Sequence, residues 1–288
     1  MKRASIKTIK IAGLVVIITV GILGLFAIWL YTGQLTESKI KIFTKLPLPI
    51  ASVNGRFIYL PSYTLRWQAY QLLSQNKLTI QSPETAKTAI FEQIVKDQEM
   101  TQIALQHGIY IDARELETEY SAQTMGESEN NFLQSLEVYG LSKNSYEQYV
   151  IKPQLFKIKM LTWFNSQADL NPNQSSLANN LTGQIKAGQD MSVLAKQFSQ
   201  EDTGKIVGGD MGFIDPTELL LEMREPIYSM NAGEVKIIPS RAGINIIKLE
   251  EKQSNKFHLR QIFLFPENFQ AWLEAQTKNF KIYKLINF

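Results

Sequence analysis

The stretch "GQDMSVLAKQFSQED", residues 188–202, and the glycine-rich "VGGDMGFID", residues 207–215, decide the fold of the second half of the chain. Asp190 is a typical N-cap residue for a short helix, and Gly188 separates this helix from the one before it. Three apolar runs follow, at 235–240, 244–250 and 257–265, and each has the length of a strand. We therefore predict an α+β domain over residues 174–265, with a small antiparallel sheet.

The last of these runs contains "HLRQIFLF", residues 258–265. In a strand its odd-numbered residues, Gln261 among them, face one way, and its even-numbered residues, His258 among them, face the other. The only other histidine, His107, is expected to end a helix just before Gly108, where a cation suits the helix dipole. With two histidines, no cysteine and no HExxH spacing, the sequence favours neither a zinc enzyme nor a disulfide framework.

The first half of the chain, residues 48–168, is predicted to be one strand followed by several helices. The strand covers residues 50–53, and Asn54-Gly55 then forms a hairpin-type turn. A helix capped by Ser82 runs to Gly108, and a later long helix is expected to kink near Pro153. The segment "ADLNPNQSS", residues 168–176, is interpreted as a polar linker to the second domain.

The beginning of the chain predicts a membrane anchor. Residues 1–10 carry four basic side chains and no acid, and residues 11–31 carry no charge. Such a segment spans a bilayer core, and the basic flank is expected to stay in the cytoplasm. We therefore predict a cytoplasmic N-terminus at 1–10, a single transmembrane anchor at 11–31, a linker at 32–47, and an extracytoplasmic remainder.

Charge excludes nucleic acid as an expected partner. Residues 1–45 hold seven Lys and Arg and one Glu, so residues 46–288 hold 30 − 7 = 23 basic and 27 − 1 = 26 acidic residues. A net charge of −3 outside the anchor region is not the basic footprint of a nucleic-acid-binding protein.

The two quoted stretches, with "REPIYSMNAGEV" (224–235) and "RAGINIIKLEE" (241–251), resemble the parvulin peptidyl-prolyl isomerase domain. The match covers about 75 residues in the family order. "VNG" at 53–55 and the helices after it resemble the N-terminal region of SurA/PrsA-type foldases. "AWLEAQTKNFKIYKLI", residues 271–286, is similar to the helix and strand that close the core of such chaperones, so 266–288 is assigned to that role. The resemblance implies that the protein binds polypeptide clients. It also implies an activity that needs no metal or cofactor.

The resemblance places the proline pocket at three residues. Leu219 stands where the family has Met or Leu, Met223 where it has Phe, and Phe213 where it has an aromatic residue. A family carboxylate position falls on Glu201 or Asp202, because "FSQED" allows two registers. Ser240 stands near a family threonine. We therefore expect Leu219, Met223 and Phe213 to bind substrate, and Glu201, Asp202 and Ser240 to occupy catalytic positions.

The two family histidine positions are both replaced. In the last strand the histidine place is Asn245. The family's first strand has no counterpart before residue 176, and its best match is "HLRQIFL", in which the histidine place is Gln261. Because that strand lies beside the last one in the family, we expect 257–264 to pair with 244–250 in a circularly permuted domain. The alternative is a degenerate domain whose late strand begins a lost second repeat. His258 faces away from Gln261, so we expect a solvated or packing role for it.

Three functions stay open at this point. The first is an anchored foldase that binds unfolded polypeptide, with weak or absent isomerase activity. The second is a fully active isomerase that uses Asn245, Gln261 and a carboxylate. The third is a non-enzymatic scaffold for envelope assembly.

Overall fold

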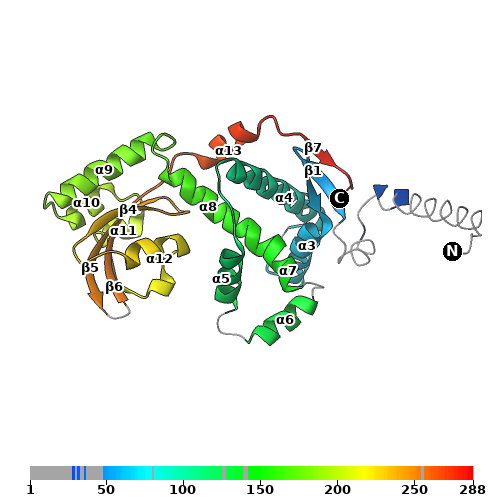
Figure 1. Ribbon diagram of the computed structural model, residues 1–288, viewed down its shortest axis with the longest axis horizontal. Coiled ribbons are helices and arrows are strands. Elements are labelled where there is room, and N and C mark those ends of the chain that lie inside the picture. The colour runs from blue at the N-terminus through cyan, green and yellow to red at the C-terminus, as the bar shows by residue number, and fades with distance from the viewer. Residues whose placement is uncertain are drawn as a thin grey trace, which may run out of the picture. The chain divides into compact units, whose positions relative to one another are not determined.

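A computed structural model describes residues 28–29, 31–32, 36, 48–79, 81–124, 128–138, 142–253 and 256–287 (Figure 1). The expected cytoplasmic segment 1–10 lies outside the described residues. So do nearly all of the expected anchor at 11–31 and of the linker at 32–47. Within the ranges that are described, no helix combines the length and the apolar character needed to cross a membrane.

The chain divides into two compact units. The first comprises Met1–Glu99, Arg114–Ile151 and Asn279–Phe288, and the second comprises Met100–Ala113 and Lys152–Lys278. This division by contacts does not test the expected domain assignment, which stays a prediction. Residues 152–168 and 266–278 group with the second unit, whereas we expected them to belong to the helical chaperone part.

The first unit contains a three-stranded antiparallel sheet with the order β2-β1-β7. Strands β1 (Pro49–Val53) and β2 (Arg56–Tyr59) are joined by the expected turn, in which Asn54 and Gly55 have φ values of 47° and 80°. Two positive φ values are typical of the tight turn that matches strand twist. Strand β2 corrects the prediction of a single strand in this half. At the other edge, β7 (Ile282–Lys284) pairs with β1.

Helices pack against this sheet and complete the first unit. Helices α3 (Leu60–Gln75) and α4 (Pro83–Gln106) share a buried core with β1 that includes Ile50, Tyr63 and Phe91. Three further helical segments belong to the same half: α5 (Ala113–Gln123), α6 (Glu129–Val138), α7 (Lys143–Tyr146). A π-helical turn, η1 (Glu147–Ile151), precedes α8 (Lys152–Ser166). This irregularity lies at the predicted kink, because Pro153 cannot donate to the preceding turn.

The second unit is built on a four-stranded antiparallel sheet with the order β3-β6-β5-β4. Its strands are β3 (Asp210–Ile214), β4 (Val235–Pro239), β5 (Ile244–Gln253) and β6 (Lys256–Leu264). The pairing expected between 257–264 and 244–250 is confirmed, since β5 and β6 run antiparallel from Ile244 opposite Leu264 to Gln253 opposite Lys256. Strand β3 corrects the prediction of three strands, because its glycine-rich sequence gave no strand pattern.

Helices cover both faces of this sheet (Figure 1). One face carries α9 (Pro172–Lys186) and α10 (Met191–Phe198), which bury Ile246 and Ile262. The other carries α12 (Leu221–Tyr228), which buries Leu249 and Leu259. The alternation predicted for "HLRQIFLF" is therefore confirmed, because Leu259 and Ile262 lie in different cores. Both are fully buried, and such a side chain stabilises a fold by about 1.5–3 kcal/mol.

Two helix boundaries differ from the prediction. Helix α9 begins at Pro172, inside the segment interpreted as a linker, because proline is well suited to the first turn. The pattern "DPTELLLEM", residues 215–223, is typical of a helix start, but the chain forms only a 3-10 turn there, η2 (Pro216–Glu218), whose Asp215 cap accepts from the Thr217 N–H at 2.9 Å. Leu219 is extended, with ψ at 150°, before α12 begins. The remaining helices of the unit are α11 (Asp202–Ile206) and α13 (Phe269–Thr277).

Candidate functional site

A pocket of about 340 Å³ lies where the α12 side of the sheet meets the segment before α12. Leu219 and Met223 form part of its floor, and both are buried. The strands contribute polar and aromatic side chains to the opposite wall. The lining residues are Glu201, Met211, Glu218, Leu219, Leu220, Met223, Ala242, Asn245, Gln261, Phe263 and Phe265. A concave, mostly apolar site with a few polar groups is typical of a ligand-binding pocket.

Asn245 and Gln261, the two positions that the resemblance aligns with family histidines, meet in this pocket. Gln261 Nε2 donates to Asn245 Oδ1 over 2.6 Å. Asn245 lies on β5 opposite Phe263, and Gln261 lies on β6 opposite Ile247, so the two amides are diagonal neighbours on one face. They form a polar pair beside Leu219 and Met223, and neither side chain titrates.

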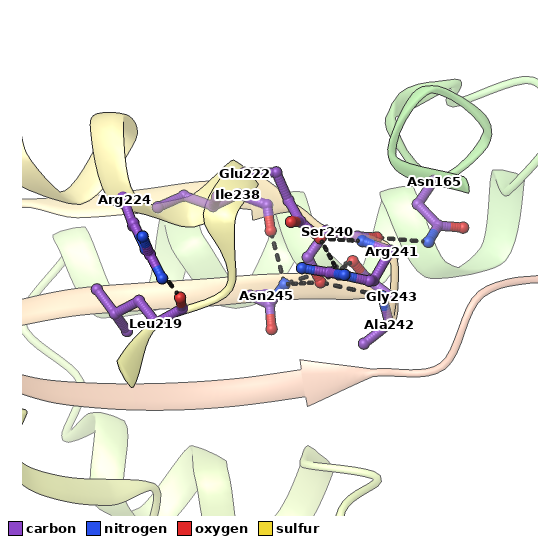
Figure 2. A network of polar contacts seen from close by, with 10 residues as sticks. All are labelled: Asn165, Leu219, Glu222, Arg224, Ile238, Ser240, Arg241, Ala242, Gly243 and Asn245. Carbon is purple, nitrogen blue, oxygen red and sulfur yellow. Dashed lines mark hydrogen bonds and ion pairs between the residues drawn. The ribbon is translucent and has the colours of Figure 1, made fainter. Parts of the chain in front are cut away.

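The orientation of the Asn245 amide is fixed by the chain around it. Asn245 Nδ2 donates to the Ile238 carbonyl at 2.8 Å and to Ser240 Oγ at 3.0 Å (Figure 2). Both amide hydrogens are therefore used inside the protein, and only Oδ1 remains to accept from Gln261. Ser240, an expected site residue, thus acts on Asn245 and is absent from the pocket lining. The buried Asn245 has an exposed fraction of 2%.

A side chain from α8 supports this arrangement. Asn165 is buried, and its Nδ2 donates to the Ser240 carbonyl at 2.7 Å, as Figure 2 shows. The bond holds the turn between β4 and β5 from outside the sheet. Sequence reasoning did not identify Asn165, because its partner is a backbone atom 75 positions away and no motif marks such a contact.

Two arginines hold the other wall of the pocket. Arg224 donates from Nε to the Leu219 carbonyl at 3.1 Å and from an Nη to the Thr217 carbonyl at 2.8 Å. These bonds fix the extended segment that presents Leu219 to the pocket. The second arginine, Arg241, contacts Glu222 Oε1 through its backbone N–H at 2.7 Å and through Nε at 3.1 Å (Figure 2). This contact joins α12 to the β4–β5 turn, and the sequence analysis missed both residues.

Gly209 allows the backbone of the turn before β3 to approach Gln261. The Gln261 N–H donates to the Gly209 carbonyl at 2.8 Å, and Gly209 has a φ of 75°. A Cβ at this position would meet the Gln261 carbonyl oxygen. The glycine is therefore required both for its dihedral angle and for the close approach.

The expected residues do not all gather in the pocket. Glu201 lines it, whereas Asp202 begins α11 and is not among the lining residues. Phe213 corrects the prediction most clearly. It lies opposite His258 in the sheet, and its ring centroid is 5.0 Å from that of His258, on the face away from Gln261. The side chain that reaches the pocket from β3 is Met211.

The histidines lie outside the pocket. His258 Nε2 is 2.8 Å from Asp210 Oδ1, and Arg260 contacts the other carboxylate oxygen at 3.2 Å. The N–H of Gly212 and then His258 hold the pKa of Asp210 below its usual range. This cluster ties the edge strand β3 to β6. His107 is exposed beyond the end of α4, and its ring centroid is 4.1 Å from that of Trp163.

Comparison with known proteins agrees with this geometry. Residues 143–253 match the family model described as the PPIC-type PPIASE domain. This part of the chain is similar to a parvulin-type domain. The matched range ends just before β6, the strand that supplies Gln261.

The similar curated proteins are named as folding factors. A "Foldase protein PrsA" from Geobacillus kaustophilus (strain HTA426) is 32% identical over 113 residues, which cover 35% of this chain and 40% of that protein. Another from Geobacillus sp. (strain WCH70) is 28% identical over 116 residues, 36% of this chain and 42% of that one. A "Chaperone SurA" from Pseudomonas aeruginosa is 32% identical over 108 residues, 34% and 26% of the two chains. The chain spans less than half the length of these relatives.

Proposed function

We propose that this protein is a folding factor whose parvulin-type pocket binds proline-containing segments of unfolded polypeptide, with weak or absent isomerase activity. The observation that carries the proposal is the meeting of Asn245 and Gln261 over an apolar floor made by Leu219 and Met223. A proline ring fits an apolar floor, and a polar pair beside it can bond to the neighbouring peptide groups. The names of the similar proteins, a foldase and a chaperone, support the same reading.

The amide pair is the reason to expect little catalysis. An X-Pro bond isomerises in tens to hundreds of seconds without help, so acceleration requires groups that favour the twisted amide. Both Nδ2 hydrogens of Asn245 are engaged by Ile238 and Ser240, which leaves this amide no donor to offer a client. Binding depends mainly on the apolar floor, which remains.

A fully active isomerase is the second candidate, and one observation favours it. Gln261 donates one of its two Nε2 hydrogens to Asn245, so the second hydrogen and Oε1 remain at the pocket wall. That donor is placed to stabilise a twisted X-Pro bond by itself. Catalysis of a prolyl peptide well above the uncatalysed rate would select this candidate over the first.

We propose further that the domain is circularly permuted. Strand β6 follows the rest of the domain in the sequence, yet it lies between β3 and β5 and is antiparallel to both. The family resemblance gives its first strand such a place beside the last. A strand that merely began a lost repeat is not expected to bury Leu259 and Ile262 in the two cores of this sheet.

The cellular setting is proposed from the sequence. The uncharged segment 11–31 after a basic N-terminus supports a single membrane anchor with the remainder of the chain outside the cytoplasm. Within the chain, we assign 48–168 and 266–288 to a SurA/PrsA-like chaperone part and 174–265 to the parvulin-like domain. Labelling of single introduced cysteines, one near residue 5 and one near residue 200, by a reagent that does not cross membranes tests the orientation.

A pair of matched substitutions tests client binding. Met223→Ala removes pocket floor, whereas Ile185→Ala removes a similarly buried side chain from the core on the other face of the sheet. Each is expected to lower the free energy of unfolding by about 2–5 kcal/mol. Only Met223→Ala should weaken binding of a fluorescent proline-containing peptide, by about tenfold, measured by anisotropy at a temperature where both variants are folded. Equal affinities for the two variants would rule out this pocket as the binding site.

A further inference from the structure

The rim of the pocket carries two carboxylates that do not belong to the amide pair. Glu201 follows α10 and Glu218 ends η2, so they reach the pocket from two separate segments. Both side chains are exposed, and neither forms an ion pair with a cation among the described residues. No lysine or arginine is among the lining residues. The pocket opening is therefore negatively charged.

The position of Glu201 is set by bonds to the end of β6. The Gln200 N–H donates to the Phe263 carbonyl at 2.8 Å, and Gln200 Oε1 accepts from the Phe265 N–H at 2.6 Å. Ser199 Oγ accepts from the Phe263 N–H at 3.2 Å. The residue after this clamp is Glu201, so its backbone is held beside the aromatic side chains of the rim.

The arginines near the pocket do not cancel this charge. The Arg241 guanidinium is bound by Glu222, so this pair contributes no net charge (Figure 2). The Arg224 guanidinium donates to the carbonyls of Leu219 and Thr217, and Arg224 is not among the lining residues. Its single positive charge is smaller than the charge of the two unpaired carboxylates at the opening.

Exposed apolar surface lies beside these carboxylates. Phe265 and Met211, which line the rim, have exposed fractions of 54% and 37%. A lysine or arginine of a client can lay its aliphatic stem on such surface while its charged end reaches a carboxylate. An aromatic face also attracts a cation. An acidic side chain gains neither contact and is repelled.

We infer that Glu201 and Glu218 are specificity-determining residues that make the pocket select proline segments with a lysine or arginine next to the proline. This inference rests on the proposed function, because it assigns a client class to the same pocket. The pocket discriminates against clients with an acidic or phosphorylated residue next to the proline. The neutral Asn245–Gln261 pair contributes nothing to this choice, so selectivity is set at the rim.

The experiment uses the full-length protein and three sets of labelled hexapeptides, each with one proline. The residue next to the proline, before it or after it, is lysine, glutamine or glutamate. Affinities are measured by anisotropy at about 20 mM and about 500 mM salt. We expect the lysine peptides to bind about fivefold more tightly than the glutamine peptides, and the glutamate peptides to bind more weakly still. The differences should shrink at high salt, because exposed charges are screened.

Charge-removing variants complete the test. Glu201→Gln with Glu218→Gln should make the three peptide sets bind alike. Glu225→Gln is the matched control, since it removes one charge from an exposed position of α12 that does not line the pocket. Equal binding of the lysine, glutamine and glutamate peptides by the wild-type protein overturns the inference alone. A lysine preference that survives the double substitution also overturns it. Failure of every peptide to bind overturns the proposed function together with the inference.

Discussion

The side chain of Gln261 donates to that of Asn245 over 2.6 Å, from a strand that follows the rest of its domain in the sequence. The two residues are 16 positions apart, and they lie on adjacent antiparallel strands. This pair joins the late strand β6 to the pocket, and Asn165 and Ser240 hold it from the other side. The site therefore depends on a strand, a turn and a helix that are distant in sequence.

Replacing Gln261 with leucine is expected to affect both stability and binding. The substitution leaves Asn245 Oδ1 buried without its donor, and an unsatisfied buried acceptor costs about 1–3 kcal/mol. Urea unfolding should show a loss of this size. Peptide affinity should fall about tenfold, because the remaining donor at the pocket wall is also removed.

The matched control for this variant is His258→Leu. His258 lies on the same strand but on the opposite face, where it contacts Asp210. Its replacement should leave peptide affinity within about twofold of wild type, although stability falls through the lost contact. If His258→Leu weakens binding as much as Gln261→Leu does, the face assignment is wrong.

Gly209→Ala should be among the most damaging single changes in the glycine-rich stretch. The added Cβ meets the Gln261 carbonyl oxygen, and the backbone has a φ of 75°. Strain and crowding together are expected to lower the free energy of unfolding by about 2–4 kcal/mol. Gly183→Ala, in α9 with open space around the added Cβ, should instead stabilise by up to about 1 kcal/mol. Thermal unfolding of both variants checks the opposite signs.

The cluster around Asp210 predicts a loss of stability in acid. Its pKa is lowered from the ordinary value of 3.8, first by the Gly212 N–H and then by His258. A carboxylate with a depressed folded-state pKa stabilises fully above its unfolded pKa, and this contribution is lost as pH falls through the folded pKa. Asp210→Asn should thus be less stable than wild type above about pH 5, by less than about 1 kcal/mol because the group is partly exposed.

Urea titrations between pH 7 and pH 2.5 measure this difference. The gap between wild type and Asp210→Asn should stay constant down to about pH 5 and close below pH 4. A gap of constant size over the whole range would mean that the lost packing or hydrogen bonds of the variant, and not the charge of Asp210, determine its stability.

Short-range signals in the sequence predicted much of this fold. Asp190 caps α10 by accepting from the Ser192 N–H, as its place before the apolar run indicated. Asn54-Gly55 forms the expected tight turn. The alternation correctly placed Gln261 and His258 on opposite faces of the strand, because a period of two is insensitive to what lies elsewhere in the chain.

The sequence could not predict features that depend on register or on distant backbone atoms. A register shift between Asp210 and Gly212 changes which residues of β3 share a face, so Met211 reaches the pocket and Phe213 does not. Arg224 and Asn165 act by donating to backbone carbonyls. Such partners exist at every position, and only the folded chain selects one of them.

Placing histidine at both Asn245 and Gln261 tests whether these two positions limit the isomerase activity. Asn245→His combined with Gln261→His returns the family residues to neighbouring strands, and each imidazole can donate and accept at once. We expect the kcat/KM for isomerisation of a prolyl peptide to rise at least about tenfold over wild type, and to acquire a pH dependence near 6.5, where free histidine titrates. Wild type should show no such dependence from this pair.

The control adds His107→Gln and His258→Gln, both outside the pocket, to the double variant. It then has as many histidines as wild type, but both lie in the pocket. It should preserve the gain in kcat/KM. Because Asn245 is buried, a folded state of each variant is confirmed first by its unfolding transition. If the folded double variant gains no activity, these two positions do not limit catalysis, and Met223, which the resemblance aligns with a phenylalanine, is the next residue to exchange.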